Sequence, residues 1–159
     1  MDIYNIWFAR IEIANSIKLR LLEQSNVEEI WKFNKSDLME LGLKECSINQ
    51  ILKEEYREKL DKYIQYLERN NIELISYKSK DYPYKLKNIM DLPAYIFVKG
   101  NKNILDDDSV AIIGSRLCSE IGKKIAFNTA KELGDKNINV VSGLANRNRY
   151  IRTYGEFKK

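Results

Sequence analysis

The sequence predicts an α/β protein, in which a helical N-terminal domain is followed by an incomplete, doubly wound parallel sheet. Up to Asn70, apolar residues recur every three or four positions, which is typical of amphipathic helices. Beyond that point, two strand-like runs, 109–114 and 138–143, flank a single helical segment with short connections. A strand–helix–strand unit of this kind is how parallel sheets are built. We therefore predict a helical domain at 1–70 and an α/β domain at 71–145.

The helical part is predicted to contain four short helices and one long helix. The short ones cover 3–13, 15–24, 27–33 and 36–42, with Asn15 or Ser16 as a cap of the second and Gly42 as the end of the fourth. The long helix is expected at 47–70. Its apolar stripe, interpreted as core packing, consists of Ile48, Leu52, Tyr56, Leu60, Tyr63 and Leu67.

The second part is predicted to contain four strands. Strands are expected at 72–77 and 95–98, with Pro83 and Pro93 marking turns around a helical turn between them. The strand at 109–114 does not alternate polar and apolar residues, which is typical of a strand covered on both faces. A helix is expected to begin at Ser119 and to end at Gly134, before the fourth strand at 138–143.

The composition excludes several classes of site. The chain has 159 residues, 44% of them hydrophobic and 31% charged, and no apolar run approaches the length of a membrane span. A secretory leader is not evident, so we expect a cytoplasmic protein with no membrane contact. Because the chain has no histidine, it cannot form Ser-His-Asp triads, Cys-His dyads or histidine metal sites. Cys46 and Cys118 lack metal-ligand spacing, and we expect no metal.

The positive net charge is concentrated at the C-terminal end. Of the 27 basic and 23 acidic residues, five basic residues and one acidic residue lie in 146–159, which leaves the rest of the chain neutral. A net charge confined to this tail does not support nucleic-acid binding by the body of the protein through bulk charge alone.

The residues that carry chemistry follow the two strands of the strand–helix–strand unit. In an open parallel sheet, ligands bind beyond the carboxyl ends of the strands. Glycines there allow close approach of an anion, serines offer hydroxyl groups, a helix N-terminus offers amide groups, and arginine binds phosphate through two hydrogen bonds. The predicted phosphate-binding set is Gly114, Ser115, Arg116, Ser119, Lys123, Ser142 and Gly143. On spacing alone, a structural turn with a solvated arginine is an equal alternative.

A larger set of motifs points to a family. The segments YPYKLKNIMDLPAYIFVKGN, VAIIGSR, GKKIA and VVSGLA, in this order between Ile72 and Ala145, resemble the bacterial DNA-processing protein A family (DprA, also called Smf). The resemblance implies that 71–145 is part of a Rossmann-like domain. The helical residues 1–70 are similar to the SAM-like, helix-hairpin-helix-type domain of that family.

The resemblance implies a DNA-binding protein that is not an enzyme and uses no cofactor. Members of the family bind single-stranded DNA during natural transformation, protect it, load the RecA recombinase, and act as dimers. By this resemblance Gly114, Ser115 and Arg116 contact phosphate, and Ser142 and Gly143 belong to a second DNA-binding loop.

The tail 146–159 departs from the family pattern, which continues with a Gly-Ile-Asp motif. Codons permitted for Ala145 and the following residues restore Ala-Ile-Gly-Ile-Asp-Thr-Phe-Ala-His when one adenine is removed. We therefore expect a frameshift after Ala145, an irregular tail, and the loss of the dimer surface and of part of the DNA-binding activity.

Two other functions remain open at this point. A Rossmann-like enzyme could hold a nucleotide phosphate on Gly114–Arg116, although Asp106, Asp107 and Asp108 lie at the opposite end of the strand and supply no acid–base pair there. A helical module at 1–70 could instead act as a protein-interaction domain. Tyr82, Tyr84 and Tyr95 are expected to pack against the fold rather than to stack on bases.

Overall fold

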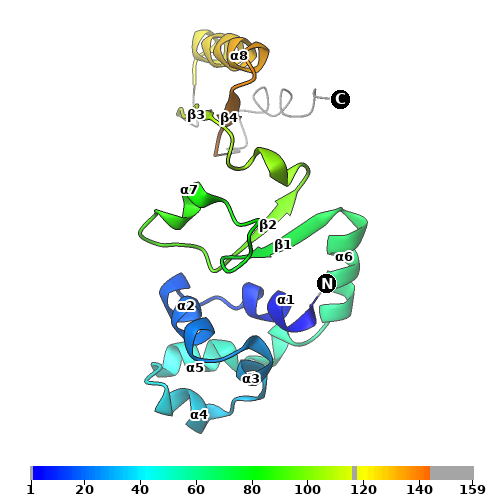
Figure 1. The fold of residues 1–159 in the computed structure, drawn as a ribbon, viewed down its shortest axis with the longest axis vertical. Helices are drawn as coiled ribbons and strands as arrows, with labels where there is room; N and C mark the ends of the chain where they lie inside the picture. The colour runs from blue at the N-terminus through cyan, green and yellow to red at the C-terminus, as the bar shows by residue number, and fades with distance from the viewer. Residues whose placement is uncertain (1, 116–117, 144–159) are drawn as a thin grey trace. The chain divides into compact units, whose positions relative to one another are not determined.

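The computed structural model describes residues 2–115 and 118–143 of the chain, which folds as a mixture of helices and small sheets (Figure 1). Its two compact units are Met1–Lys102 and Asn103–Lys159. The expected boundary near Asn70 therefore falls inside the first unit. Arg116 and the tail 146–159, with its expected irregular conformation, lie outside the described residues. In the described ranges, every helix is too short or too polar to cross a membrane.

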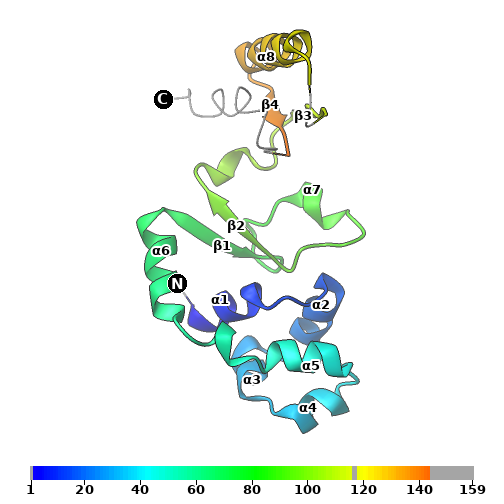
Figure 2. The same cartoon turned by 180° about the vertical axis from the view of Figure 1, so that it is seen from behind.

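The first unit begins with five helices that gather on one side of a β-hairpin (Figures 1 and 2). Their bounds are α1 Ile3–Arg10, α2 Asn15–Gln24, α3 Val27–Lys32, α4 Lys35–Glu40 and α5 Glu45–Ile51. Short polar side chains begin three of them, because Asp2 caps α1 and capping boxes at Asn26 and Asn34 begin α3 and α4. Gly42, with a φ of 71°, follows α4 as expected.

The single long helix expected at 47–70 is wrong. The segment consists of α5, a 3₁₀ turn at Glu54–Tyr56, and α6 at Leu60–Arg69, with Lys59 in the left-handed conformation at a φ of 56°. Tertiary contacts stabilise the break between α5 and α6. The side chain of Tyr56 is buried, and the backbone carbonyl oxygen of Tyr56 accepts a hydrogen bond from the Arg10 side chain at 3.4 Å. These contacts outweigh the helical periodicity, which is a weak local preference.

The core of the first unit is rich in aromatic side chains. Ile6, Trp7 and Phe8 are completely buried in α1, and Trp7 meets Trp31 of α3 edge to face with ring centres 4.9 Å apart. Burying three successive residues requires cover on several sides of so short a helix. The other helices and the hairpin provide this cover.

The hairpin explains why the first unit extends to Lys102. Strands β1 (Ile72–Ser76) and β2 (Tyr95–Lys99) pair antiparallel, with Leu74 opposite Phe97, and the connection between them contains α7 (Tyr84–Lys87). Leu74 and Tyr95 pack against the helical core. The hairpin is a separate two-stranded sheet and does not join the parallel strands of the second unit, which differs from the expected division of the chain.

The second unit contains the predicted strand–helix–strand arrangement. Strand β3 (Ser109–Ala111), α8 (Glu120–Asp135) and β4 (Asn139–Val141) follow one another, and β3 and β4 pair in parallel with Val110 opposite Val140. Helix α8 packs against β4 of this strand pair (Figure 1). The expectation that the first of these strands is covered on both faces is wrong for the described residues, since all three residues of β3 are exposed.

Candidate functional site

The parallel register brings two polar loops to one edge of the second unit. Ala111 pairs with Val141, and the Ile112 amide donates to the Val141 carbonyl oxygen at 2.9 Å, which extends the pairing beyond β3. Gly114 and Ser115 follow one strand at this edge, and Ser142 and Gly143 follow the other. This placement confirms that the two loops come from neighbouring strands and lie together beyond the carboxyl ends of β3 and β4. We call this place, formed by Gly114, Ser115, Ser142 and Gly143, the strand edge.

In the described residues, the fold does not require glycine at position 114 or 143. Gly114 and Gly143 lack the positive φ that favours glycine, and a Cβ atom added to either would meet no other atom within 4 Å. Gly42, by contrast, needs its φ of 71° to end a helix. Within 2–115 and 118–143, no atom occupies the space in which a Cβ atom would stand at Gly114 or Gly143, so this space can admit a ligand.

The start of α8 is held by Ser119. Its Oγ accepts a hydrogen bond from the Gly122 amide at 3.1 Å, and its carbonyl oxygen accepts one from the Lys123 amide at 3.0 Å. This is the N-cap geometry expected from the sequence. The hydroxyl hydrogen of Ser119 can still be donated, since the cap uses only the oxygen as an acceptor.

Lys123 lies one turn into α8 and already has an acidic partner. Its ammonium group binds the carboxylate of Glu120, a residue that the sequence interpretation did not include in the site. The three-residue spacing of the pair along a helix was the available signal. Glu120 is 87% exposed, and exposed ion pairs are weak, so Lys123 can exchange this partner for a phosphate at small cost.

Of the seven site residues predicted from the sequence, six lie within the described residues: Gly114, Ser115, Ser119, Lys123, Ser142 and Gly143. The structure brings the four loop residues to the strand edge and places Ser119 at the N-cap of α8 and Lys123 one turn into that helix. Arg116 lies outside the described residues.

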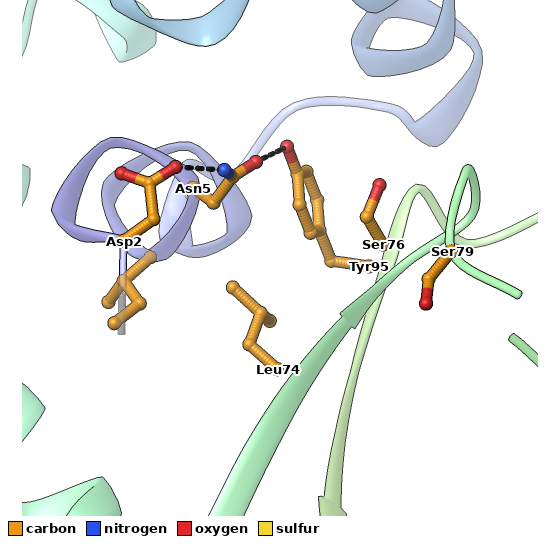
Figure 3. A pocket seen from close by; sticks show the side chains of 7 residues that line it. Asp2, Asn5, Leu74, Ser76, Ser79 and Tyr95 are labelled. Carbon is orange, nitrogen blue, oxygen red and sulfur yellow. Dashed lines mark hydrogen bonds between the residues drawn. The ribbon is translucent and has the colours of Figure 1, made fainter. Parts of the chain in front are cut away.

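A small pocket with both polar and apolar lining in the first unit is a second place where a ligand could bind (Figure 3). It measures about 280 Å³ and lies between α1 and the hairpin. Its polar side chains bind one another: the Tyr95 hydroxyl donates to Asn5 Oδ1 at 2.6 Å, and the Asn5 amide donates to Asp2. Burial raises the pKa of the Tyr95 phenol far above its ordinary value, so that it remains a hydrogen-bond donor.

This pocket offers little for catalysis, because its carboxylate, amide and phenol already satisfy each other. Groups of three or more potential metal ligands do not occur within 2–115 and 118–143. The pocket can hold water or a small polar molecule, whereas the strand edge of the second unit is open to a chain-like ligand.

Comparisons with known proteins match the segment of the chain that contains both loops. The family model described as DNA recombination-mediator protein A matches residues 73–147, which include both loops of the strand edge. The chain is 34% identical over 93 residues to the DNA processing protein DprA of Bacillus subtilis, an alignment that covers 58% of this chain and 31% of that protein. Residues 73–147, just under half of the chain, thus match the DprA/Smf family.

Two further DprA/Smf relatives show how far the likeness extends. The DNA processing protein DprA of Streptococcus pneumoniae is 41% identical over 64 residues, which are 40% of this chain and 22% of that protein. Protein Smf of Borreliella burgdorferi is 28% identical over 131 residues, or 80% of this chain and 40% of that protein. The chain thus spans well under half the length of the curated DprA/Smf relatives it matches. No solved structure matches it significantly.

Proposed function

We propose that this chain is a single-stranded DNA-binding protein of the DNA-processing type, active in natural transformation, and that its strand edge in the second unit holds the phosphates. The observation that carries this proposal is the parallel register of β3 and β4, which brings the loops at Gly114 and Gly143 together inside the segment that matches the family model. In this proposal β3, α8 and β4 form one unit of a Rossmann-like sheet.

Backbone groups are the main phosphate ligands in this proposal. The backbone conformation of Gly114 and Gly143 does not itself require glycine, and no atom lies where their Cβ atoms would stand. A phosphate can therefore approach the main chain closely at both positions. The first turn of α8 adds amide groups that lack acceptors within the helix and a positive partial charge. Ser115, Ser119 and Lys123 add polar and charged contacts, together with Arg116 by resemblance. Contacts of this kind do not depend on base sequence.

The proposed activity is binding without a chemical step. The protein covers incoming single strands and delivers them to a RecA-type recombinase in the cytoplasm, and it requires no cofactor. Glu120 forms an ion pair with Lys123 and therefore supports the binding site rather than acting as a general base.

A binding titration with paired glycine variants tests the proposal. We expect Gly114→Ala and Gly143→Ala to weaken binding of a labelled oligothymidine, measured by fluorescence anisotropy, because the added methyl group occupies the space of the phosphate. Gly134→Ala is the matched control, since its Cβ also meets no atom within 4 Å and it lies near the opposite end of α8. Affinity for the wild type should fall steeply with salt.

Three outcomes would contradict the proposal. Equal binding by all three glycine variants would place the DNA elsewhere. Loss of affinity in Lys158→Ala that matches the loss in Arg116→Ala would show that tail charge, not the strand edge, binds the strand. Displacement of the oligonucleotide by low concentrations of a mononucleotide would favour the nucleotide-binding enzyme instead. Loading of RecA onto strands covered by single-strand-binding protein tests the delivery step.

A further inference from the structure

Three aromatic side chains of the first unit form a row, and its middle ring, Tyr63, also packs against the hydrophobic core. The rings of Tyr63 and Tyr66 in α6 stack with centres 6.3 Å apart and planes at 27°. Phe97 of β2 meets Tyr63 edge to face, also at 6.3 Å. Tyr66 is 55% exposed and Phe97 is 42% exposed, so both ends of this row are open to solvent.

The burial of α6 shows that Tyr66, unlike Tyr63, lies outside the core. Leu60 and Leu67 fill the buried side of the helix, with 4% and 1% exposure. Tyr66 is the residue before Leu67 in α6 and does not share its burial, because successive helical residues point about 100° apart. A scattered exposed apolar residue needs no explanation, but two exposed rings that both contact Tyr63 form a patch.

Cationic side chains surround the row. Lys62 and Arg69 precede and follow Tyr66 by four and three residues, a spacing that places all three on one side of α6. Lys99 is two residues beyond Phe97 and therefore lies on the same face of β2. The guanidinium of Arg10 lies 4.6 Å from the ring centre of Tyr63.

Acidic side chains lie to one side of this surface. Asp61 and Glu68 are seven residues apart and share a different side of α6 from Tyr66. Glu55 lies toward Arg10 and forms an ion pair with Lys53 at 2.7 Å; the hydrogen bond and charge of Lys53, together with the charges of Arg10 and Lys59, lower the pKa of its carboxyl group. The row of rings is thus bordered mainly by positive charge. We call Tyr63, Tyr66, Phe97 and the cations Arg10, Lys62, Arg69 and Lys99 the α6 strip.

We propose that the α6 strip binds a single-stranded nucleic acid, with bases stacked on Tyr66 and Phe97 and phosphates bound by the surrounding cations. Proteins that bind single strands without sequence preference combine these two features, because every base has a flat π face and every link carries a negative charge. An acidic protein segment would use the cations but would leave the exposed rings without a partner. The strip lies wholly in the first unit, so this proposal does not depend on the strand edge of the second.

The first test replaces the rings of Tyr66 and Phe97 by leucine, an apolar side chain that cannot stack on a base. In the full chain, Tyr66→Leu with Phe97→Leu should weaken binding of an oligothymidine about tenfold or more, since each lost base stack is costly. Tyr84→Leu is the matched control, because Tyr84 is 67% exposed on α7 and is not part of the strip. Oligouridine and a DNA duplex are tested in parallel, to distinguish DNA from RNA and to show that unstacked bases are needed.

A spectroscopic readout separates stacking from a change in folding. A 2-aminopurine base in the oligonucleotide should be quenched on binding to the wild type, and this quenching should be lost in the double leucine variant while its circular dichroism stays unchanged. For the cations, Lys62→Gln with Arg69→Gln should reduce the salt dependence of binding. Arg20→Gln with Lys32→Gln, two exposed helical cations outside the strip, is the matched control.

The results distinguish this proposal from the proposed function. If the leucine pair binds and quenches like the wild type, the α6 strip is not a nucleic-acid site, whatever the glycine variants of the second unit show. If Gly114→Ala loses binding while the leucine pair keeps it, the strand edge is the binding site and the proposal for the α6 strip is wrong. Displacement of the oligonucleotide from the strip by polyglutamate as readily as by oligothymidine would assign it to an acidic protein partner instead.

Discussion

The guanidinium carbon of Arg57 lies 4.6 Å from the ring centre of Trp31, and Nη2 of Arg57 donates a hydrogen bond to the Trp31 carbonyl oxygen at 2.7 Å. The second tryptophan, Trp7, lies 5.6 Å from the same guanidinium. Arg57 belongs to the segment between α5 and α6 where the expected long helix is broken. The contact therefore joins the break to α3 and to the aromatic core.

Replacing Arg57 tests the strength of this contact. We expect Arg57→Met to destabilise the protein by about 1–2 kcal/mol, because it loses a cation–π contact and a charge-assisted hydrogen bond. The loss is limited, since Nε of Arg57 is buried without a hydrogen-bond partner in the described structure. Urea unfolding followed by tryptophan fluorescence measures it. Arg20→Met, at an exposed position of α2, should leave stability unchanged, and an equal loss in both variants would contradict the prediction.

Lys18 predicts a specific pH dependence of stability. Its side chain is 7% exposed and donates to the Ala9 carbonyl oxygen at 2.8 Å, and burial lowers its pKa from 10.5 to about 8. Between these two values the unfolded chain binds the proton and the folded protein does not, so stability rises with pH. Below the folded pKa the cost of burying the charge is fully present.

We expect the free energy of unfolding of the wild type to gain on the order of 2–3 kcal/mol relative to Lys18→Met between pH 7 and pH 10.5. Denaturant unfolding at several pH values measures the difference, in which the other titrating groups cancel. Lys32→Met, at an exposed position, provides the control. Parallel curves for the wild type and Lys18→Met would show that Lys18 keeps an ordinary pKa.

Lys59 predicts a stabilising substitution. It is exposed and has a φ of 56°, a conformation that costs a residue with a Cβ atom about 1 kcal/mol or more. Lys59→Gly should therefore raise stability by about 0.5–1 kcal/mol, reduced by the greater flexibility of glycine in the unfolded chain. Thermal unfolding compares it with Lys59→Ala, which removes the charge but keeps the Cβ atom. A gain of equal size in both variants would attribute the effect to charge.

Exposed isoleucines on α8 predict binding of an apolar dye by the second unit. Ile121 is 74% exposed and Ile125 is 61% exposed, and their spacing of four residues places them side by side. We expect Ile121→Lys with Ile125→Glu to reduce the fluorescence of anilinonaphthalene sulfonate. Ile89→Lys replaces an exposed isoleucine of the first unit and should have little effect. Unchanged dye binding in the α8 variant would show that these side chains are covered in solution.

Local signals in the sequence were sufficient for most elements. Ser119 begins α8 through its own side chain and Gly42 follows α4 with a positive φ, both as expected, because each boundary depends on atoms a few residues apart. The expected cap of α2 at Asn15 or Ser16 is wrong, since both residues lie inside the helix and Ala14 precedes it without a side-chain hydrogen bond. The fourth helix begins after Asn34 rather than at Ser36. Local signals were also sufficient for the strand–helix–strand unit at 109–143, where short connections allow a parallel pair. Its polar loops were found for this reason, whereas the ion pair of Lys123 with Glu120 was not considered.

By itself, the sequence determined the mixture of helices and strands, the resemblance to the DprA/Smf family, and the two loops that follow β3 and β4. Only the tertiary structure decided where α5 ends and α6 begins, and that the hairpin belongs with the helices in the first unit. The break depends on Arg10 and Arg57, whose partners Tyr56 and Trp31 lie 46 and 26 residues away. Helical periodicity in 47–70 describes only neighbours along the chain. It therefore contains no information about these distant contacts, whose free energy exceeds the local preference for one continuous helix.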